Sequence, residues 1–184
     1  MVDIKAITKD IISTLITVAL IIGVGIALTG TWPFMVAVQS GSMEPHLHIG
    51  DVVILVSPSK TKIVTWVEGK QEDYKSFGDY GDVIVYYPNG DRRITPIIHR
   101  VIAWVNAGDR IPVLDHTTGR LKLSNVVAKS SGYITQGDHN PFPDQLAELP
   151  NGKRIQPVKD LWIVGVAKFR IPYVGYFRLI LQRI

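Results

Sequence analysis

An uncharged apolar run over residues 11–29 is the feature that most limits how this chain can fold. The run reads IISTLITVALIIGVGIALT and contains no proline. As a helix with a rise of about 1.5 Å per residue it would be roughly 28 Å long, close to the ~30 Å hydrocarbon thickness of a bilayer. The alternative is a cleaved secretory signal. Such signals have a shorter apolar core, about 7–15 residues, and a small-residue cleavage site that the closing Ala-Leu-Thr matches poorly. We therefore predict a retained transmembrane anchor.

The basic residues predict the orientation of this anchor. Lys5 and Lys9 precede the apolar run, and the next Lys or Arg along the chain is Lys60. Because positive charge is retained on the cytoplasmic side, we expect a cytoplasmic N-terminus and a single pass through the cell membrane. Trp32 and Phe34 follow the run where an interfacial aromatic belt would lie. The predicted parts are a cytoplasmic stub and anchor (1–31), an extracytoplasmic domain (32–170) and an apolar tail (171–184).

The residues after the anchor predict a mainly β domain. The chain contains 16 Gly and 11 Pro, and its apolar fraction of 46% argues against disorder. Short apolar runs alternate with turn residues such as those at 88–91 and 118–119. The tail could lie in the membrane interface or pack as a helix on the domain. We expect strands at 52–56, 83–87, 97–105, 133–136 and 161–169, one helical turn at 144–149, a loop or hairpin insertion at 57–80 with a possible strand at 63–67, and a variable insertion at 106–132.

Composition also excludes several kinds of chemistry. The chain has no cysteine, so disulfides and thiol catalysis are both excluded. The net charge of +4 is modest and its basic residues are scattered. This charge favours contact with anionic membrane lipid, but no Lys/Arg block marks a nucleic-acid site.

The segment 39–45, which reads QSGSMEP, could hold an exposed nucleophile. Gly41 allows a sharp turn before Ser42, and Pro45 fixes the exit of that turn. The turn could expose the Ser42 hydroxyl and direct its backbone N–H toward a substrate carbonyl, with Ser40 adding a second donor. Met43 is the expected apolar pin under the turn. Taken alone, this segment could equally be an ordinary surface turn.

A serine nucleophile also needs a base and an acid that orients the base. His99 lies inside an apolar strand, which is unusual for an imidazole, although a structural role is the more common one. Asp138 and Asp144 follow in a loop rich in turn residues, where acidic side chains are often simply solvated. Each residue is weak evidence alone, and the combination of Ser, His and Asp beside an anchor favours a hydrolase.

Other possible metal-binding or catalytic groups of residues are less well supported by the sequence. His46 and His48 form an H-x-H pair that could bind zinc, but no third ligand is nearby in sequence. His116 and His139 lie in loops whose positions the sequence does not define. Lys60 or Lys62 could serve a Ser–Lys dyad, but both lie in a polar loop where a solvated charge is expected. We therefore expect neither a metal nor a cofactor.

Several segments resemble type I signal peptidases, in the order in which that family carries them. Residues 40–45 (SGSMEP) and 49–53 (IGDVV) resemble the family's nucleophile box, and 98–101 (IHRV) its base-bearing strand. The remaining similar segments are 81–86 (GDVIVY, the next strand), 137–140 (GDHN) with Asp144 (the acidic loop), and 164–167 and 171–175 (the final strand and tail).

The resemblance implies a role for each candidate residue. It makes Ser42 the nucleophile, His99 the general base and then acid, and Asp144 the orienting acid, with Asp138 in a supporting role. Ser40 and the backbone N–H of Ser42 match the oxyanion hole. The third residue of the acidic loop is a histidine where the family commonly has Asn, so the choice between the two aspartates stays open.

The resemblance also implies a subtype and a fold. A histidine base, where bacterial members carry lysine, resembles the archaeal enzymes and the catalytic subunit of the endoplasmic-reticulum complex, and the compact chain favours the archaeal type. The implied fold is a signal-peptidase-like β-rich peptidase core to which the substrate pairs as an added strand. We expect a membrane-bound serine endopeptidase that cleaves signal peptides from secreted preproteins, with partner subunits unknown. The alternative is a non-catalytic, membrane-tethered β domain that binds protein partners.

Overall fold

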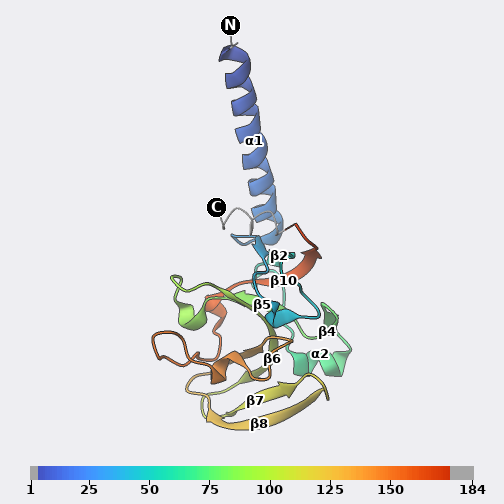
Figure 1. Cartoon of the computed structure of the whole chain (residues 1–184), viewed down its shortest axis with the longest axis vertical. Helices are drawn as coiled ribbons and strands as arrows, with labels where there is room; N and C mark the ends of the chain where they lie inside the picture. Colours follow the sequence, from blue (N-terminus) through green and yellow to red (C-terminus); the bar gives the residue numbers. More distant parts are fainter. Residues whose placement is uncertain (1–3, 175–184) are drawn as a thin grey trace.

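The computed structural model describes residues 4–174, and a long N-terminal helix stands away from a β-rich domain (Figure 1). This helix, α1, covers Ile4–Thr29 and therefore begins earlier than the predicted 11–29. Its segment Ile7–Thr29 has a mean hydropathy of 2.6 and none of the apolar window is buried against the domain. By length and composition α1 could cross a membrane, as the sequence predicted.

The C-terminal end of α1 is tied to the domain by hydrogen bonds. Lys60 donates from its Nζ atom to the carbonyl oxygens of Ala27 at 2.7 Å and Leu28 at 3.3 Å. The backbone N–H of Ser57 donates to the carbonyl of Thr29 at 2.8 Å. Because the last carbonyls of a helix carry partial negative charge, Lys60 both satisfies and neutralises this end. The sequence predicted only a solvated charge at Lys60, whereas the structure shows that this side chain caps α1.

A strongly curled antiparallel sheet of six strands forms the body of the domain (Figure 1). All five predicted strand regions are confirmed within two residues at each end. The sequence missed the short first strand, because three residues give too little alternation to detect. In sheet order the strands are β1 (Met35–Ala37), β2 (Val52–Val56), β10 (Ile163–Ile171), β5 (Val83–Tyr86), β6 (Ile97–Val105) and β9 (Gly132–Gln136).

Apolar side chains on both faces of this sheet form the core. One cluster contains Met43 and Leu47 from the turn after β1, packed on Val53 and Leu55 of β2, and all four side chains are fully buried. This burial confirms the prediction that Met43 holds down the turn containing Ser42. The burial of β5 over its whole length explains why its sequence is continuously apolar rather than alternating.

The 57–80 segment contains a helix that the sequence analysis missed. The possible strand at 63–67 is wrong, because helix α2 occupies Trp66–Glu72 and a hairpin of β3 (Lys75–Ser76) and β4 (Asp79–Tyr80) follows. A capping box begins α2: Thr65 accepts from the Glu68 N–H at 3.1 Å, and Glu68 accepts from the Thr65 N–H at 2.9 Å. The Thr-x-x-Glu signature of this box was visible in the sequence.

The 106–132 insertion is a second hairpin rather than an irregular loop. Its strands are β7 (Arg110–Asp115) and β8 (Arg120–Val127), joined by the predicted turn at 118–119. Strand β8 is exposed along most of its length, so it lacks the buried apolar residues that would have revealed it. The short 3₁₀ helices are η1 (Gly41–Met43), η2 (Pro88–Gly90), η3 (Asp144–Leu146) and η4 (Asp160–Trp162).

Two of the predicted turns form as short 3₁₀ helices. The turn predicted at 88–91 is formed by η2, and the helical turn predicted at 144–149 is the shorter η3. Of the predicted tail 171–184, Ile171 closes β10, and residues 175–184 lie outside the described residues. The membrane-lying tail therefore stays a prediction.

Gly81, just before β5, lies in close contact with the backbone at the N-terminus of α2. Its replacement should therefore lower the stability of the domain. Gly81 has φ +75°, and an added Cβ would lie 2.5 Å from the backbone nitrogen of Trp66. Gly108 has φ +97° but nothing within 4 Å of an added Cβ. Gly108→Ala should therefore cost only the backbone strain, about 1–2 kcal/mol. Gly81→Ala adds a backbone clash and should cost about 2–5 kcal/mol.

Denaturant unfolding of the two variants in detergent micelles measures both costs. Equal costs for the two substitutions would contradict a close backbone contact between Gly81 and α2.

Candidate active site

Ser42 lies on the 3₁₀ turn η1, which follows the edge strand β1. The turn is fixed from below by the fully buried Met43, whose carbonyl accepts from the N–H groups of His46 at 3.0 Å and Leu47 at 2.9 Å. The N–H of Glu44 donates to the carbonyl of Gly41 at 3.1 Å and closes the turn. Ser42 is half-buried, so its hydroxyl is held by a rigid turn and still reaches the surface.

His99 projects toward this serine from strand β6, which lies between β5 and β9 in the sheet. Its Nε2 atom lies 2.9 Å from the Ser42 hydroxyl oxygen, although the two residues are 57 positions apart in sequence. Only 6% of His99 is exposed, and its backbone pairs with Ile84 of β5. The curled sheet thus brings a distant imidazole within hydrogen-bond reach of the hydroxyl, although three strands separate β1 from β6 in the sheet order.

Asp144 holds the other nitrogen of the His99 ring. Both carboxylate oxygens of Asp144 lie 2.8 Å from His99 Nδ1. A carboxylate can only accept, so Nδ1 carries the hydrogen and Nε2 of the neutral ring accepts from Ser42. The Ser42, His99 and Asp144 side chains therefore form one continuous line of hydrogen bonds.

Two hydroxyl groups support Asp144 from neighbouring strands. Tyr86 of β5 and Thr135 of β9 each donate to its Oδ2 atom at 2.7 Å. Burial raises the pKa of the Tyr86 hydroxyl well above its ordinary value, and the negative charge of Asp144 raises this pKa further. Tyr86 therefore remains a hydrogen-bond donor throughout the physiological pH range. The sequence analysis missed both residues, because a hydroxyl in a β strand gives no signal of its partner.

Asp138 binds a different set of side chains. Arg100, which is fully buried on β6, donates from Nε to Oδ1 at 2.8 Å and from Nη2 to Oδ2 at 2.7 Å. His46 donates from Nδ1 to Oδ2 at 2.8 Å. Burial raises the pKa of the Asp138 carboxyl, but the hydrogen bonds from His46 and Arg100 outweigh burial and leave the pKa below its ordinary value. The geometry thus pairs His99 with Asp144 and pairs Asp138 with Arg100.

The loop that carries Asp138 nevertheless contacts the Ser42 turn. The N–H of His139 donates to the carbonyl of Ser42 at 2.9 Å. A Cβ added to Gly137 would lie 2.5 Å from that carbonyl oxygen and 2.8 Å from His99 Nε2. Only glycine fits at this position, because the loop packs directly against Ser42 and His99. The ion pair between Arg100 and Asp138 holds this loop in place.

A cleft of about 1040 Å³ opens beside these residues. Residues 33–42 form one wall and residues 92–99 the other, with Ser42 and His99 among the lining side chains. Ser40, a predicted oxyanion donor, also lines the cleft, with its hydroxyl oxygen 3.3 Å from that of Ser42.

One group of side chains could in principle hold a metal ion. Ligand atoms of Asp79, His116 and Asp138 lie within 4.8 Å of one another. The buried guanidinium of Arg100 already occupies both oxygens of Asp138, and its positive charge opposes a second cation there. His46 and His48 do not act as a pair, because His46 contacts Asp138 and His48 contacts Asp51. The geometry gives no support to a metal centre at either place.

Comparisons with known proteins give matches over most of this chain. A model of the family described as signal peptidase, peptidase S26, matches residues 9–167. The SEC11 catalytic subunit of the signal peptidase complex from Schizophyllum commune is 32% identical over 84% of this chain and 67% of its own length. The corresponding SEC11 protein of Yarrowia lipolytica is 31% identical over 80% of this chain and 62% of its own.

An animal relative gives a similar match. The human SEC11C catalytic subunit is 30% identical over 85% of this chain and 62% of its own length. This chain therefore spans only about two thirds of the length of the curated relatives that it matches. These relatives are fungal and animal, so they confirm the family resemblance and give no support to the archaeal type.

The environment of Asp138 predicts acid-sensitive stability. Its carboxyl pKa lies below the ordinary value of 3.8 in the folded chain, so the unfolded chain binds more protons between the two values. The stabilisation is complete above pH ~4 and is lost as the pH falls toward the folded pKa. The melting temperature should therefore fall more steeply below pH ~4 in the wild type than in Asp138→Asn.

Thermal unfolding between pH 6 and pH 2 measures these slopes. Glu72→Gln, at an exposed position on α2, is the control and should keep the wild-type slope. Identical slopes for the wild type and Asp138→Asn would contradict this account.

Proposed function

The chain belongs to the signal peptidase family, peptidase S26, and from this membership we propose that it is a membrane-bound serine endopeptidase that removes signal peptides from preproteins. The observation that supports this activity best is the line of hydrogen bonds from Ser42 through His99 to Asp144. A serine hydroxyl becomes a good nucleophile when a neighbouring base removes its proton. The proposed reaction is hydrolysis of a peptide bond through an acyl-enzyme.

The first step is attack by the Ser42 oxygen on the scissile carbonyl carbon while His99 Nε2 takes the hydroxyl proton. Asp144 accepts from Nδ1, which fixes the tautomer and stabilises the imidazolium that forms. His99 then gives its proton to the departing amine, leaving the acyl group on Ser42. A water molecule, deprotonated by His99, releases the acyl group and restores the serine.

Negative charge develops on the carbonyl oxygen during both steps. We assign its stabilisation to the backbone N–H of Ser42 and the hydroxyl of Ser40, which stands beside Ser42 in the cleft. Preorganised donors of this kind typically contribute a factor of about 10²–10³ in kcat each. Asp138 has a supporting role: with Arg100 it holds the loop against which Ser42 rests.

The proposed substrate is an extended segment of a preprotein. The cleft between residues 33–42 and 92–99 can accept such a segment as an added strand. By resemblance to the family, small side chains one and three residues before the cleaved bond would fit shallow apolar pockets. The alternative of a non-catalytic binding domain has no observation in its favour. Such a domain would not need a buried carboxylate, that of Asp144, hydrogen-bonded to the imidazole of His99.

The proposed topology follows from α1 and its flanking charges. Lys5 and Lys9 favour a cytoplasmic N-terminus, and the domain from residue 32 to 170 then lies outside. Location in the cell membrane remains the prediction from the sequence. The relatives are named as catalytic subunits of a complex, and we propose that this chain also acts beside partner subunits.

Replacement of Ser42 tests the nucleophile. Ser42→Ala should reduce cleavage of a model preprotein to background, because no other hydroxyl is aligned with His99 Nε2 among the described residues. Ser40→Ala is the matched variant, since it removes a neighbouring hydroxyl but keeps the nucleophile, and kcat should fall only about 10²–10³-fold. Cleavage is followed by gel shift of the preprotein in detergent micelles. Retained cleavage by Ser42→Ala would reject this serine as the nucleophile.

A second pair of variants separates the two aspartates. Asp144→Asn keeps the size of the side chain but no longer enforces the required tautomer of His99, so kcat should fall about 10⁴-fold. Asp138→Asn leaves the contact between His99 and Asp144 in place and should keep kcat within about tenfold, with lower stability. Single-turnover cleavage and thermal unfolding measure the two effects. The opposite ranking of kcat would assign the orienting role to Asp138.

A further inference from the structure

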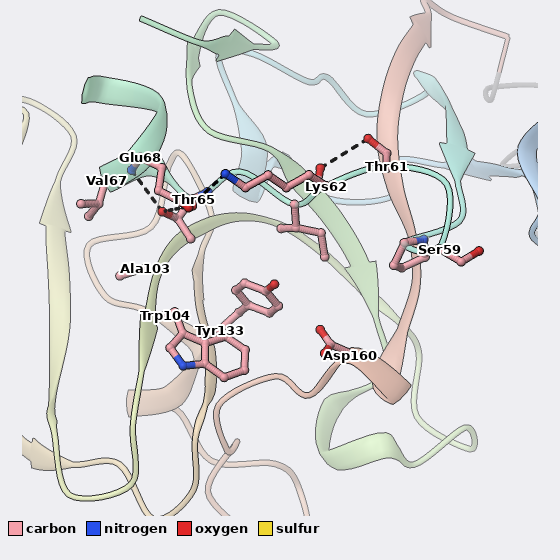
Figure 2. Close-up of a pocket in the computed structure, with 12 residues that line it drawn as sticks. Ser59, Thr61, Lys62, Thr65, Val67, Glu68, Ala103, Trp104, Tyr133 and Asp160 are labelled. Carbon is pink, nitrogen blue, oxygen red and sulfur yellow. Dashed lines mark hydrogen bonds and ion pairs between the residues drawn. The ribbon is translucent and has the colours of Figure 1, made fainter. Parts of the chain in front are cut away.

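A second pocket lies on the β-rich domain (Figure 2). Its volume is about 800 Å³, and it shares no lining residue with the cleft beside Ser42. Strand β6 contributes to both: His99 faces the cleft, and Trp104, five positions further on, lines the second pocket. At about 3.3 Å per residue these positions are roughly 17 Å apart, so the two sites are separate. We call it the Trp104 pocket.

Two aromatic rings form its centre. Trp104 and Tyr133 pack edge to face with ring centroids 4.8 Å apart. Trp104 is 47% exposed, an unusual position for a large ring on the surface of a β domain. Figure 2 shows the two rings together, with Asp160 to their right and the Lys62–Glu68 pair above them.

The charges around the rings leave one carboxylate without an ionic partner. Lys62 and Glu68 pair with each other at 3.4 Å. Asp160 has no ion pair among residues 4–174, and the ammonium of the adjacent Lys159 instead lies over the ring of Trp162. Burial raises the pKa of the Tyr133 hydroxyl, and the negative charges of Asp160 and Glu68 raise this pKa further. The pocket therefore combines an aromatic surface with one carboxylate that has no ion pair among the described residues.

A positive side chain is the ligand that fits this chemistry. A cation is attracted to the face of an indole and to a carboxylate at the same time. Arginine fits better than lysine because its planar guanidinium stacks on aromatic rings and can bind a carboxylate through two N–H groups. Leu161, next to Asp160, is 93% exposed and offers an apolar contact beyond the pocket.

From these observations we propose that the Trp104 pocket is a docking site for an arginine side chain presented by a protein partner. The guanidinium lies against Trp104 and pairs with Asp160, and the partner's flanking residues cover Leu161. One wall of the pocket, Pro58 to Ile63, contains Lys60, which caps the end of α1. A partner that docks here is thus held beside the anchor while the cleft containing Ser42 stays open.

A titration of the full-length chain in detergent micelles tests this site directly. The probe is the tripeptide acetyl-Gly-Arg-Gly-amide, and its matched control carries the uncharged isostere citrulline. Binding is followed by the indole N–H resonance of Trp104 in ¹⁵N-labelled protein, which Trp104→Phe identifies by its disappearance. An exposed cation–π contact with one ion pair predicts a saturable shift with a dissociation constant of about 1–50 mM. The citrulline peptide should bind at least about tenfold more weakly.

Replacement of Asp160 then tests the carboxylate. Asp160→Asn should weaken binding of the arginine peptide about threefold to tenfold, whereas Glu72→Gln, at an exposed position outside the pocket, should leave it unchanged. The other indole resonances report whether each variant remains folded. Absence of a saturable shift, equal binding of the citrulline peptide, or full affinity in a folded Asp160→Asn variant would each overturn the proposal.

Cleavage of a model preprotein by Asp160→Asn should match the wild type, because Asp160 does not line the catalytic cleft. The binding measurement is thus independent of the proposed peptidase activity. It can fail or succeed whether or not Ser42 is the nucleophile.

Discussion

The geometry around Ser42 depends on one buried carboxylate, that of Asp144. A charged group inside a protein is stable only when hydrogen bonds replace the water it has lost. Three elements supply them: Tyr86 from β5, His99 from β6 and Thr135 from β9. These strands are adjacent in the sheet, in the order β5-β6-β9. The strand order therefore satisfies the carboxylate and, by the same contacts, directs the second nitrogen of His99 at the serine.

The two aspartates show how a short loop can serve two purposes. Asp138 and Asp144 are only six residues apart, but one binds the buried guanidinium of Arg100 and the other the imidazole of His99. His99 and Arg100 are neighbours on β6 and point to opposite faces of the strand, as alternate residues must. The loop from Gly137 to Asp144 thus wraps the strand and is fixed on both sides of it. The Asp138 side positions the loop against Ser42, and the Asp144 side meets the proposed base.

The same strand connects the catalytic cleft with the Trp104 pocket. His99 lies near one end of β6 and Trp104 near the other, while Lys60 joins the pocket wall to the end of α1. A rigid, mostly buried strand can therefore hold a peptide-binding cleft and a separate docking site in fixed relation. This arrangement keeps the proposed docking site clear of the cleft beside Ser42.

The sequence by itself determined the long N-terminal apolar helix and the strands with buried apolar runs, and it singled out Ser42 and His99 as candidates, because length, hydropathy and turn chemistry are local properties. It did not determine the exposed hairpin β7–β8, whose strands bury little, or α2, whose capping box was present but outweighed by its β-branched neighbours. It left open whether Asp138 or Asp144 contacts His99, and it gave no sign of Tyr86, Thr135 or Arg100 as partners. Those pairings arise only when strands distant in sequence become neighbours. Hydrogen bonding between side chains depends on distances of about 3 Å that no local pattern specifies.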